Sequence, residues 1–304
     1  MSVQLEQYRI FAAVARHKSF GLAAKALFVT QPAVSQSVRQ LESQLGTQLF
    51  IRTPKGTLLT QAGEILYQYV ESALSLLSGA ENRIAELKAL EHGTLNIGAN
   101  DTLCQHFLLP YLQQYHEKYP AVNIRVTNRT SSETVELLRY GKVDLGFINA
   151  FTERGDQFTV TPLRQLHDCF VCRPDKFPQL TEPVSLRELT DFPLLMLETE
   201  SASRRSLDAF CKSVRAPLQP QIELGSHELL LAFAERGLGV AAVTREYSTD
   251  YLQDGRLCEI RLKEKIPPRA ISLIHLRRIP LSFAAREFAA LLPKTETNAP
   301  DRNE

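Results

Sequence analysis

Three residues, at positions 28–30, separate two stretches of helical periodicity near the start of the chain, and this short spacing most constrains the fold. The stretch before it carries apolar residues at helical spacing, namely Phe20, Ala23, Ala24 and Leu27. The stretch after it does the same with Val34, Val38, Leu41 and Leu45. Because Ala24 is small and the connection is tight, the two stretches are predicted to form a helix-turn-helix.

The second of these helices has clear signals at both ends. Thr30 is suited to cap its N-terminus, Pro32 is tolerated in a first turn, and Gly46 is typical of a helix stop. Its outward side carries hydroxyls, amides and a guanidinium, which are groups that hydrogen-bond base edges and phosphates. From these residues alone, an ordinary solvated surface helix explains the pattern equally well.

The distribution of charge favours a DNA-binding surface. Residues 1–60 contain seven basic and two acidic side chains, a net charge of +5, whereas the whole chain carries +1 and the remainder therefore −4. This asymmetry indicates that the N-terminal end binds a polyanion. Residues 49–52 and 57–59 are predicted to form two short strands, a wing that follows the helix capped by Thr30. The predicted DNA-binding residues are Thr30, Gln31, Pro32, Ser35, Gln36, Arg39, Arg52 and Lys55.

Residues 11–64, "FAAVARHKSFGLAAKALFVTQPAVSQSVRQLESQLGTQLFIRTPKGTLLTQAGE", resemble the winged helix-turn-helix of LysR-type transcriptional regulators. The "TQPAVS", "LG..LF.R" and "LT.AG" pieces keep the spacing of that family without a gap. Two positions depart from it: Gly21 replaces a frequent capping threonine or serine, and Leu58 replaces a frequent basic residue. The resemblance implies a DNA-binding regulator that responds to a small-molecule effector.

Residues 61–91 contain no proline and are predicted to form one long linker helix. Apolar residues at alternating spacings of four and three predict a coiled-coil seam for dimerisation, made by Leu66, Val70, Ala73, Leu77, Ala80, Ile84 and Leu87. The alternative is a helix packed on its own domain. The resemblance implies that such linker helices pair between subunits. The helix that begins near Gln31 would be the recognition helix, the one that enters the DNA major groove. A dimer could then place two such helices about 34 to 36 Å apart, in successive major grooves.

Beyond residue 92, strand-like and helical runs alternate, which predicts parallel sheets with helices on both faces. The resemblance implies two lobes of the periplasmic-binding-protein-like type 2 fold, with a cleft between them. The predicted fold class is therefore α+β multidomain: a winged helix-turn-helix, a linker helix and a two-lobed α/β domain. We predict that these occupy residues 1–60, 61–91 and 92–304, with lobe I at 92–161 and 268–304 and lobe II at 162–267.

Small polar residues follow several of the predicted strands. Ligands of open α/β sheets bind beyond the carboxyl ends of strands, where helix N-termini offer free N–H groups. The predicted effector-binding residues are Asn100, Thr102, Arg129, Thr130, Ser131, Asn149, Ser201 and Ser203, a set that suits a small anion. By resemblance, Thr102, Thr130 and Ser201 lie near the effector site. As alternatives, the hydroxyls are simple helix N-caps, and Arg129 forms an ion pair between the lobes.

Other motifs give little support for catalysis, a metal or a cofactor. The "CFVC" run, Cys169 to Cys172, has redox spacing, but in a strand residues three apart point to opposite faces. Five cysteines without a secretory signal predict reduced thiols in the cytoplasm. Neither a zinc-protease motif nor a serine elbow is present, so an enzyme is not expected.

No run approaches the roughly 20 apolar residues of a membrane helix, so a membrane is not an expected partner. The sequence therefore predicts a cytoplasmic transcriptional regulator that binds a dyad-symmetric site on double-stranded DNA. A small-molecule effector in the cleft is expected to modulate it, a dimer or tetramer is the expected assembly, and RNA polymerase is a candidate partner. The alternative is an α/β enzyme or small-molecule-binding protein with an appended helix-turn-helix.

Overall fold

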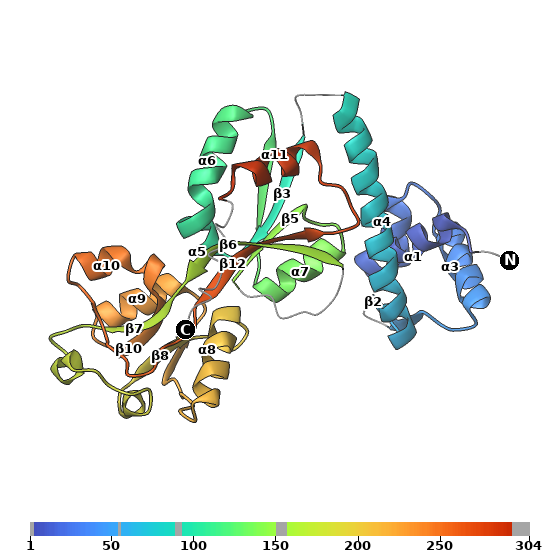
Figure 1. Cartoon of the computed structure of the whole chain (residues 1–304). Helices are drawn as coiled ribbons and strands as arrows, with labels where there is room; N and C mark the ends of the chain where they lie inside the picture. The colour runs from blue at the N-terminus through green and yellow to red at the C-terminus, as the bar shows by residue number, and fades with distance from the viewer. Residues whose placement is uncertain (1–2, 54–55, 89–92, 150–156, 294–304) are drawn as a thin grey trace, which may run out of the picture. The chain divides into compact units, whose positions relative to one another are not determined.

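The computed structural model describes residues 3–53, 56–88, 93–149 and 157–293. The chain divides into an N-terminal unit, which runs to Lys88 and also includes Arg139–Lys142, and a second unit that carries two five-stranded sheets (Figure 1). Each unit has hydrophobic clusters of its own. Within the described ranges, no helix is long and apolar enough to cross a membrane.

The N-terminal unit contains the predicted helix-turn-helix and its wing. Helices α1 (Leu5–His17), α2 (Phe20–Ala26) and α3 (Gln31–Leu45) precede an antiparallel pair, β1 (Phe50–Thr53) and β2 (Gly56–Leu59). The buried sides of all three helices meet in one core, where the Phe11 ring lies 5.2 Å from that of Phe50. The predicted stripe of α3 is buried at Val34, Val38 and Leu41, whereas Leu45 is exposed at the helix end.

Part of the linker helix α4 (Gln61–Lys88) packs against the helix-turn-helix of the same chain. Val70 is only 6% exposed and, with Leu66, packs into the helix-turn-helix core. These two positions of the predicted seam are therefore used inside the subunit, because the core of three short helices needs a fourth apolar surface. Further along the seam, Leu77 and Ile84 are exposed, and so are Ala73 and Ala80. The Leu87 side chain lies outside the described residues.

The first sheet of the second unit has the order β4-β3-β5-β12-β6. Its strands are β3 (Thr94–Ala99), β4 (Asn123–Asn128), β5 (Leu145–Ile148), β6 (Phe158–Leu166) and β12 (Arg269–Leu276). Helices α6 (Leu109–Lys118) and α11 (Phe283–Leu291) contribute to the core on one face, and α7 (Ser131–Arg139) contributes to another cluster. A Cβ at Gly146 would lie 2.8 Å from side chains of Leu138 and Thr134, so glycine allows α7 to pack closely on the sheet.

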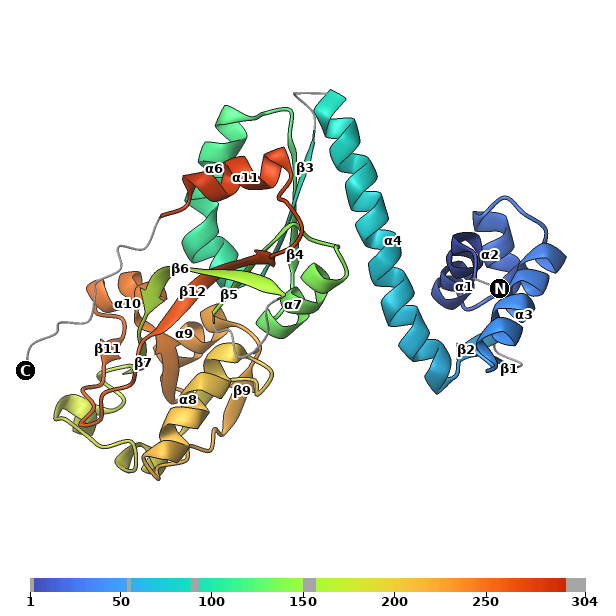
Figure 2. The same cartoon turned by 45° about the vertical axis from the view of Figure 1, so that its right-hand side comes forward.

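The second sheet has the order β11-β7-β10-β8-β9. Its strands are β7 (Asp168–Cys172), β8 (Leu194–Leu197), β9 (Ile222–Leu224), β10 (Val240–Thr244) and β11 (Cys258–Glu259). Helices α8 (Ala202–Ser213) and α9 (His227–Glu235) pack into separate clusters against it (Figure 2). Cys169 and Cys172 fall into these two different clusters, which confirms that they point to opposite faces of β7.

Both sheets are mixed: the predicted parallel pairing holds for β3 with β4 and β5, and for β8 with β9 and β10, but two strands of each sheet depart from it. Strand β12 is antiparallel to β5 and β6, and β7 is antiparallel to β10 and β11. The chain passes between the sheets as extended strands instead of crossover helices, and such strands pair antiparallel with their neighbours. The two passages are tied together by Arg269, whose Nη2 donates to Asp168 Oδ1 over 2.8 Å and to Thr244 Oγ1 over 2.6 Å. The domain and lobe boundaries given above stay predictions.

Candidate functional site

The N-terminal end of α3 is capped as the sequence indicates. Thr30 Oγ1 accepts a hydrogen bond from the Ala33 backbone N–H over 3.4 Å, and Pro32 lies in the first turn. Gly46 ends the helix in the left-handed conformation with φ +68°, which a residue with a Cβ adopts only with strain. The two ends of α3 are thus fixed by residues within or beside the helix.

The outer side of α3 is open to solvent. Gln31, Pro32, Gln36 and Arg39 are exposed together with Thr30, and Ser35 is half-buried. Within the described ranges Arg39 forms no ion pair or side-chain hydrogen bond. The Arg52 backbone lies on β1, but its side chain and the whole of Lys55 lie outside the described residues. The six α3 positions predicted to bind DNA are therefore gathered at one helix end and along one side.

Acidic side chains do not oppose this surface. Glu42 Oε1 accepts hydrogen bonds from the backbone N–H groups of Leu49, over 2.8 Å, and Phe50, over 3.3 Å. Its carboxylate thus joins α3 to the wing. Glu6 lies on α1, 3.9 Å from Arg9. With both acidic side chains of residues 1–60 so occupied, the exposed row of α3 keeps its cationic and polar character.

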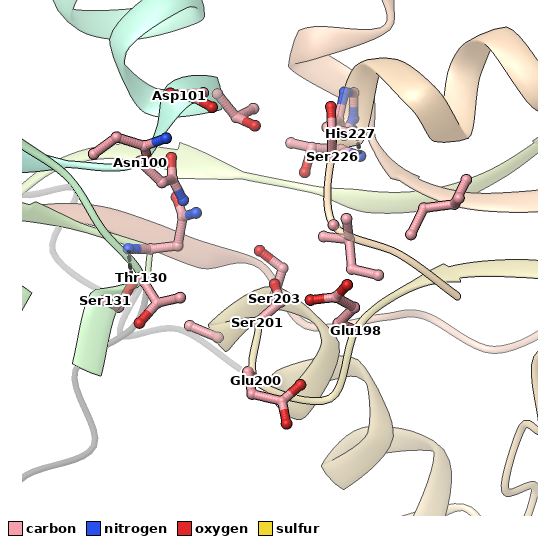
Figure 3. Close-up of a pocket in the computed structure, with 18 of the residues that line it drawn as sticks. Asn100, Asp101, Thr130, Ser131, Glu198, Glu200, Ser201, Ser203, Ser226 and His227 are labelled. Carbon is pink, nitrogen blue, oxygen red and sulfur yellow. Dashed lines mark hydrogen bonds between the residues drawn. The ribbon is translucent and has the colours of Figure 1, made fainter. Parts of the chain in front are cut away.

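A cavity of about 180 Å³ lies between the carboxyl ends of strands from both sheets (Figure 3). It is lined by all eight residues predicted to bind an effector, which come from segments that the chain separates by as much as about 100 residues. They are Asn100, Thr102, Arg129, Thr130, Ser131, Asn149, Ser201 and Ser203. The structure brings this set together, and its role in ligand binding stays a prediction.

Three of these residues also hold the local structure of the first lobe. Asn100 Oδ1 accepts from the Leu103 N–H over 2.8 Å and caps a helical turn. Thr130 and Glu133 form a reciprocal cap at α7, with the Thr130 N–H 3.0 Å from Glu133 Oε2 and the Glu133 N–H 3.4 Å from Thr130 Oγ1. Ser131 Oγ accepts from the Asn149 N–H over 3.3 Å. The capping alternative therefore holds for Thr130, and Asn100 is a cap as well, whereas the Ser131 hydroxyl binds the backbone just after β5.

Other hydroxyls remain available to a ligand. Those of Thr102, Ser201 and Ser203 make no hydrogen bond with any described residue. Ser201 occupies the N-cap position of α8, yet its side chain does not bond to the helix. The first N–H groups of this twelve-residue helix therefore lack a side-chain cap beside the cavity, where they favour an anionic group.

The charges around the cavity are mixed. Arg129 does not form the interlobe ion pair considered above, because its Nη1 donates to Asn128 O over 2.7 Å and its Nε lies 4.0 Å from Glu133 Oε1. Asp101 and Glu198 line the cavity from opposite lobes, and neither forms an ion pair with another described residue (Figure 3). The strand-end rule could have found Glu198, which follows β8, but our sequence analysis missed it.

A polar cluster that the sequence analysis missed joins the lobes beside the cavity. His106 Nε2 lies 3.1 Å from Glu228 Oε1, and the His106 ring stacks on Tyr247 at 4.7 Å. The hydrogen bond from His106 lowers the pKa of Glu228 to about 2. Because these residues are more than 100 positions apart, only the tertiary structure reveals the pair. A second link runs from Arg205 Nη2 to Ser132 Oγ over 3.1 Å.

His227 lines the cavity as a buried, neutral imidazole. Burial lowers its pKa to about 4. Its Nε2 lies 3.1 Å from the Thr244 backbone N–H, which can only donate, so the neutral ring carries its hydrogen on Nδ1. That Nδ1 has no hydrogen-bond partner among the described residues.

This tautomer bears on metal binding, because ligand atoms of His106, His227 and Glu228 lie within 4.8 Å of one another. His227 has no free lone pair, since Nε2 already accepts from Thr244 and Nδ1 carries the hydrogen. Only two ligands remain, and a zinc site uses at least three protein ligands. The arrangement supports a hydrogen-bonded link between lobes instead of a metal site.

Comparison with protein families gives two matches that together span most of the chain. Residues 5–64 match the model described as "Bacterial regulatory helix-turn-helix protein, lysR family". Residues 88–296 match the "LysR substrate binding domain". The two matches correspond to the N-terminal helix-turn-helix and to the two-sheet unit.

Similar proteins extend over nearly the full length. The uncharacterized HTH-type transcriptional regulator YeiE of Escherichia coli is 29% identical over 288 residues, covering 95% of this chain and 96% of that protein. A probable RuBisCO transcriptional regulator of Trichormus variabilis is 30% identical over 307 residues, covering 99% and 90%. These relatives support a regulator of transcription.

Solved structures share the fold. ArgP from Mycobacterium tuberculosis has a TM-score of 0.70 at 22% identity, covering 95% of this chain and 98% of its own. Full-length CbnR complexed with its target DNA has a TM-score of 0.65 at 20% identity, with coverage of 95% and 98%. Taken with the two family matches, the exposed α3 row and the two-lobed unit lead to one conclusion: the chain belongs to the LysR family of bacterial DNA-binding transcriptional regulators, which are not enzymes.

Proposed function

We propose that this LysR family member binds a dyad-symmetric operator through the start of α3, and that a small ligand in the cavity between its lobes modulates DNA binding or bending. The observation that carries the proposal is the convergence of all eight predicted effector residues on one cavity. The exposed row of α3, in a segment with a net charge of +5, supports the DNA half of the proposal. Its place of action would be the cytoplasm, where the DNA lies.

The cavity favours a small ligand with one anionic group, such as a carboxylate. The N-terminal N–H groups of α8 and the hydroxyls of Thr102, Ser201 and Ser203 supply donors for it. Asp101 and Glu198 supply negative charge that no described residue pairs, so a ligand of high negative charge would be repelled. The ligand that fits both sets is a monoanion that also carries hydrogen-bond donors.

The proposed dimer would use the exposed apolar side of α4. Ile65 and Tyr69 are 55% and 74% exposed, and Leu77 and Ile84 extend an exposed apolar surface toward the other end of the helix. Ile65 and Tyr69 directly precede Leu66 and Val70, which are packed in the helix-turn-helix core. The apolar residues available to a partner at this end of α4 are therefore shifted by one position from the predicted seam. Large exposed apolar side chains on one helix are typical of a contact with another subunit.

Ligand and DNA would be coupled through the lobes. Closure around a ligand would change the angle between paired subunits and so the spacing of their recognition helices. Coupling free energies of this kind are about 1 to 3 kcal/mol, which changes affinity roughly 5- to 150-fold. The hydrogen bonds His106–Glu228 and Arg205–Ser132 join the lobes beside the cavity and would be adjusted during closure.

DNA binding in increasing salt tests the proposal. A regulator should prefer a dyad site. Its log K should fall linearly with the logarithm of the salt concentration, with a slope of about −0.9 for each phosphate neutralised. Gln31→Ala or Gln36→Ala should relax sequence preference at a cost of about 1 to 3 kcal/mol, whereas Lys55→Ala should weaken all duplexes alike. Equal losses on specific and random duplexes from the glutamine changes would refute the assignment of α3 as the recognition helix.

A further inference from the structure

The turn between α2 and α3 contains an apolar residue in a conformation that usually belongs to glycine. Phe28 has φ +56°, in the left-handed region. The Phe28 N–H donates to Lys25 O over 3.2 Å, and the Val29 N–H donates to Ala24 O over 3.0 Å. These two bonds define the Schellman motif at the end of α2, in which glycine is usual at the position that Phe28 occupies.

The Phe28 side chain gains nothing from burial in the free protein. It is 96% exposed, more than any other large apolar residue in the described ranges. A left-handed backbone disfavours a residue with a Cβ, and an exposed aromatic ring leaves its apolar surface in water. Lys18 and Arg215 share the left-handed conformation but have charged side chains that water solvates well. Phe28 therefore destabilises the free protein through both its backbone conformation and its exposed ring. Such locally unfavourable residues concentrate at functional positions.

The location of Phe28 indicates what covers its ring. It lies two residues before Thr30, the N-cap of α3, and three before Gln31, the first residue of that helix. The N-terminal end of a recognition helix is the part that contacts base edges, and the surrounding segment has a net charge of +5. An exposed apolar side chain at this place has a matching apolar surface in the major groove, the 5-methyl group of thymine.

We propose that Phe28 is a specificity-determining residue that packs its ring on a thymine methyl group of the operator, next to the bases contacted by the start of α3. This inference rests on the proposed DNA-binding function. It adds a large apolar contact to a surface whose hydrogen-bonding groups are amides, hydroxyls and a guanidinium. The contact neutralises no phosphate, so it should contribute to sequence preference without changing the salt dependence of binding.

The test uses the full-length protein with Phe28→Gly, which removes both the ring and the backbone penalty. Leu45→Ala is the matched control, because Leu45 is an exposed apolar residue at the C-terminal end of α3, far from the turn that contains Phe28. Phe28→Gly should weaken operator binding about fourfold for each thymine methyl group that the ring covers in the parent complex, with an unchanged salt slope. Its unfolding temperature should be equal to or above that of the parent protein, and Leu45→Ala should bind the operator normally.

Operators with deoxyuridine in place of single thymidines identify the contact, because uracil lacks only the methyl group. The parent protein should lose affinity at one thymine, and Phe28→Gly should show no further loss there. An unchanged affinity of Phe28→Gly, an equal loss on random duplexes, or a lower unfolding temperature would each overturn the inference. Gln31→Ala measured in parallel separates the two proposals: if it relaxes specificity while Phe28→Gly has no effect, only the Phe28 contact is refuted.

Discussion

The two candidate sites of this protein are built in opposite ways. The proposed DNA-binding row of α3 comes from one continuous segment, residues 30–39, whose other side is buried at Val34 and Val38. The cavity is assembled from the ends of strands in two sheets, between Asn100 and Tyr247. A site on one helix depends on local periodicity, whereas a site between lobes depends on how distant segments meet.

The sites also differ in how far their polar groups are already satisfied. On α3, Gln36 and Arg39 have no side-chain partner within the described ranges. Around the cavity, Asn100 and Thr130 are engaged in helix caps, while Thr102 and Ser201 are not. Chemically similar residues of the cavity therefore have different roles: some stabilise the fold, and others are available to bind a ligand. A substitution can accordingly change stability, ligand binding or both.

The largest effect expected concerns the separation of the two units. Phe11→Ala removes a fully buried ring beside Phe50, and Phe288→Ala removes one 5.4 Å from the Tyr115 ring. Each cavity should cost about 3 to 5 kcal/mol of unfolding free energy. In scanning calorimetry, Phe11→Ala should lower only the transition of the N-terminal unit and abolish DNA binding. Phe288→Ala should lower only that of the two-sheet unit. A common shift of both transitions would show that the units unfold together.

A somewhat smaller effect should depend on pH and appear only in the two-sheet unit. The pKa of His227 is about 4 in the folded state, below its ordinary value of 6.5. Folding therefore favours the neutral ring, and this contribution is fully present above pH 6.5. It is lost as the pH falls from 6.5 toward 4, up to about 3 kcal/mol.

The measurement is urea unfolding of the protein and of His227→Gln across that pH range. The difference between the two cancels the contributions of other titrating groups. The parent should lose more stability than the variant on acidification, because a protonated imidazole cannot accept from the Thr244 N–H. Parallel pH profiles for the two proteins would contradict the assignment of a buried neutral His227.

The smallest effect separates two threonines of the cavity. Thr130→Ala should cost about 0.5 to 2 kcal/mol because it removes the side-chain cap of α7. Thr102→Ala should change stability by less than about 0.5 kcal/mol, since its hydroxyl has no partner among the described residues. Both should abolish the effector response while sparing basal DNA binding. Thermal unfolding and gel-shift titration provide the two readouts, and a normal effector response in Thr102→Ala would remove that residue from the site.

The sequence was most informative where structure is local. The cap at Thr30, the stop at Gly46 and the stripe of α3 are all read from neighbouring residues, and the structure confirms them except at Leu45, which is exposed. Strand ends were also recognisable, so the eight cavity residues could be chosen in advance. Heptad spacing was less informative on α4, because it cannot tell whether Val70 faces a partner or its own core.

By itself, the sequence determined the helix-turn-helix and the chemistry of its exposed row, because periodicity and capping act within a few residues. Only the tertiary structure decided which hydroxyls of the cavity lack a hydrogen-bond partner among the described residues, which carboxylates line the same cavity and that His106 meets Glu228. Those outcomes depend on competition for hydrogen bonds between segments as much as 122 residues apart. The folded backbone brings such groups together, and no spacing along the chain encodes which of them will pair.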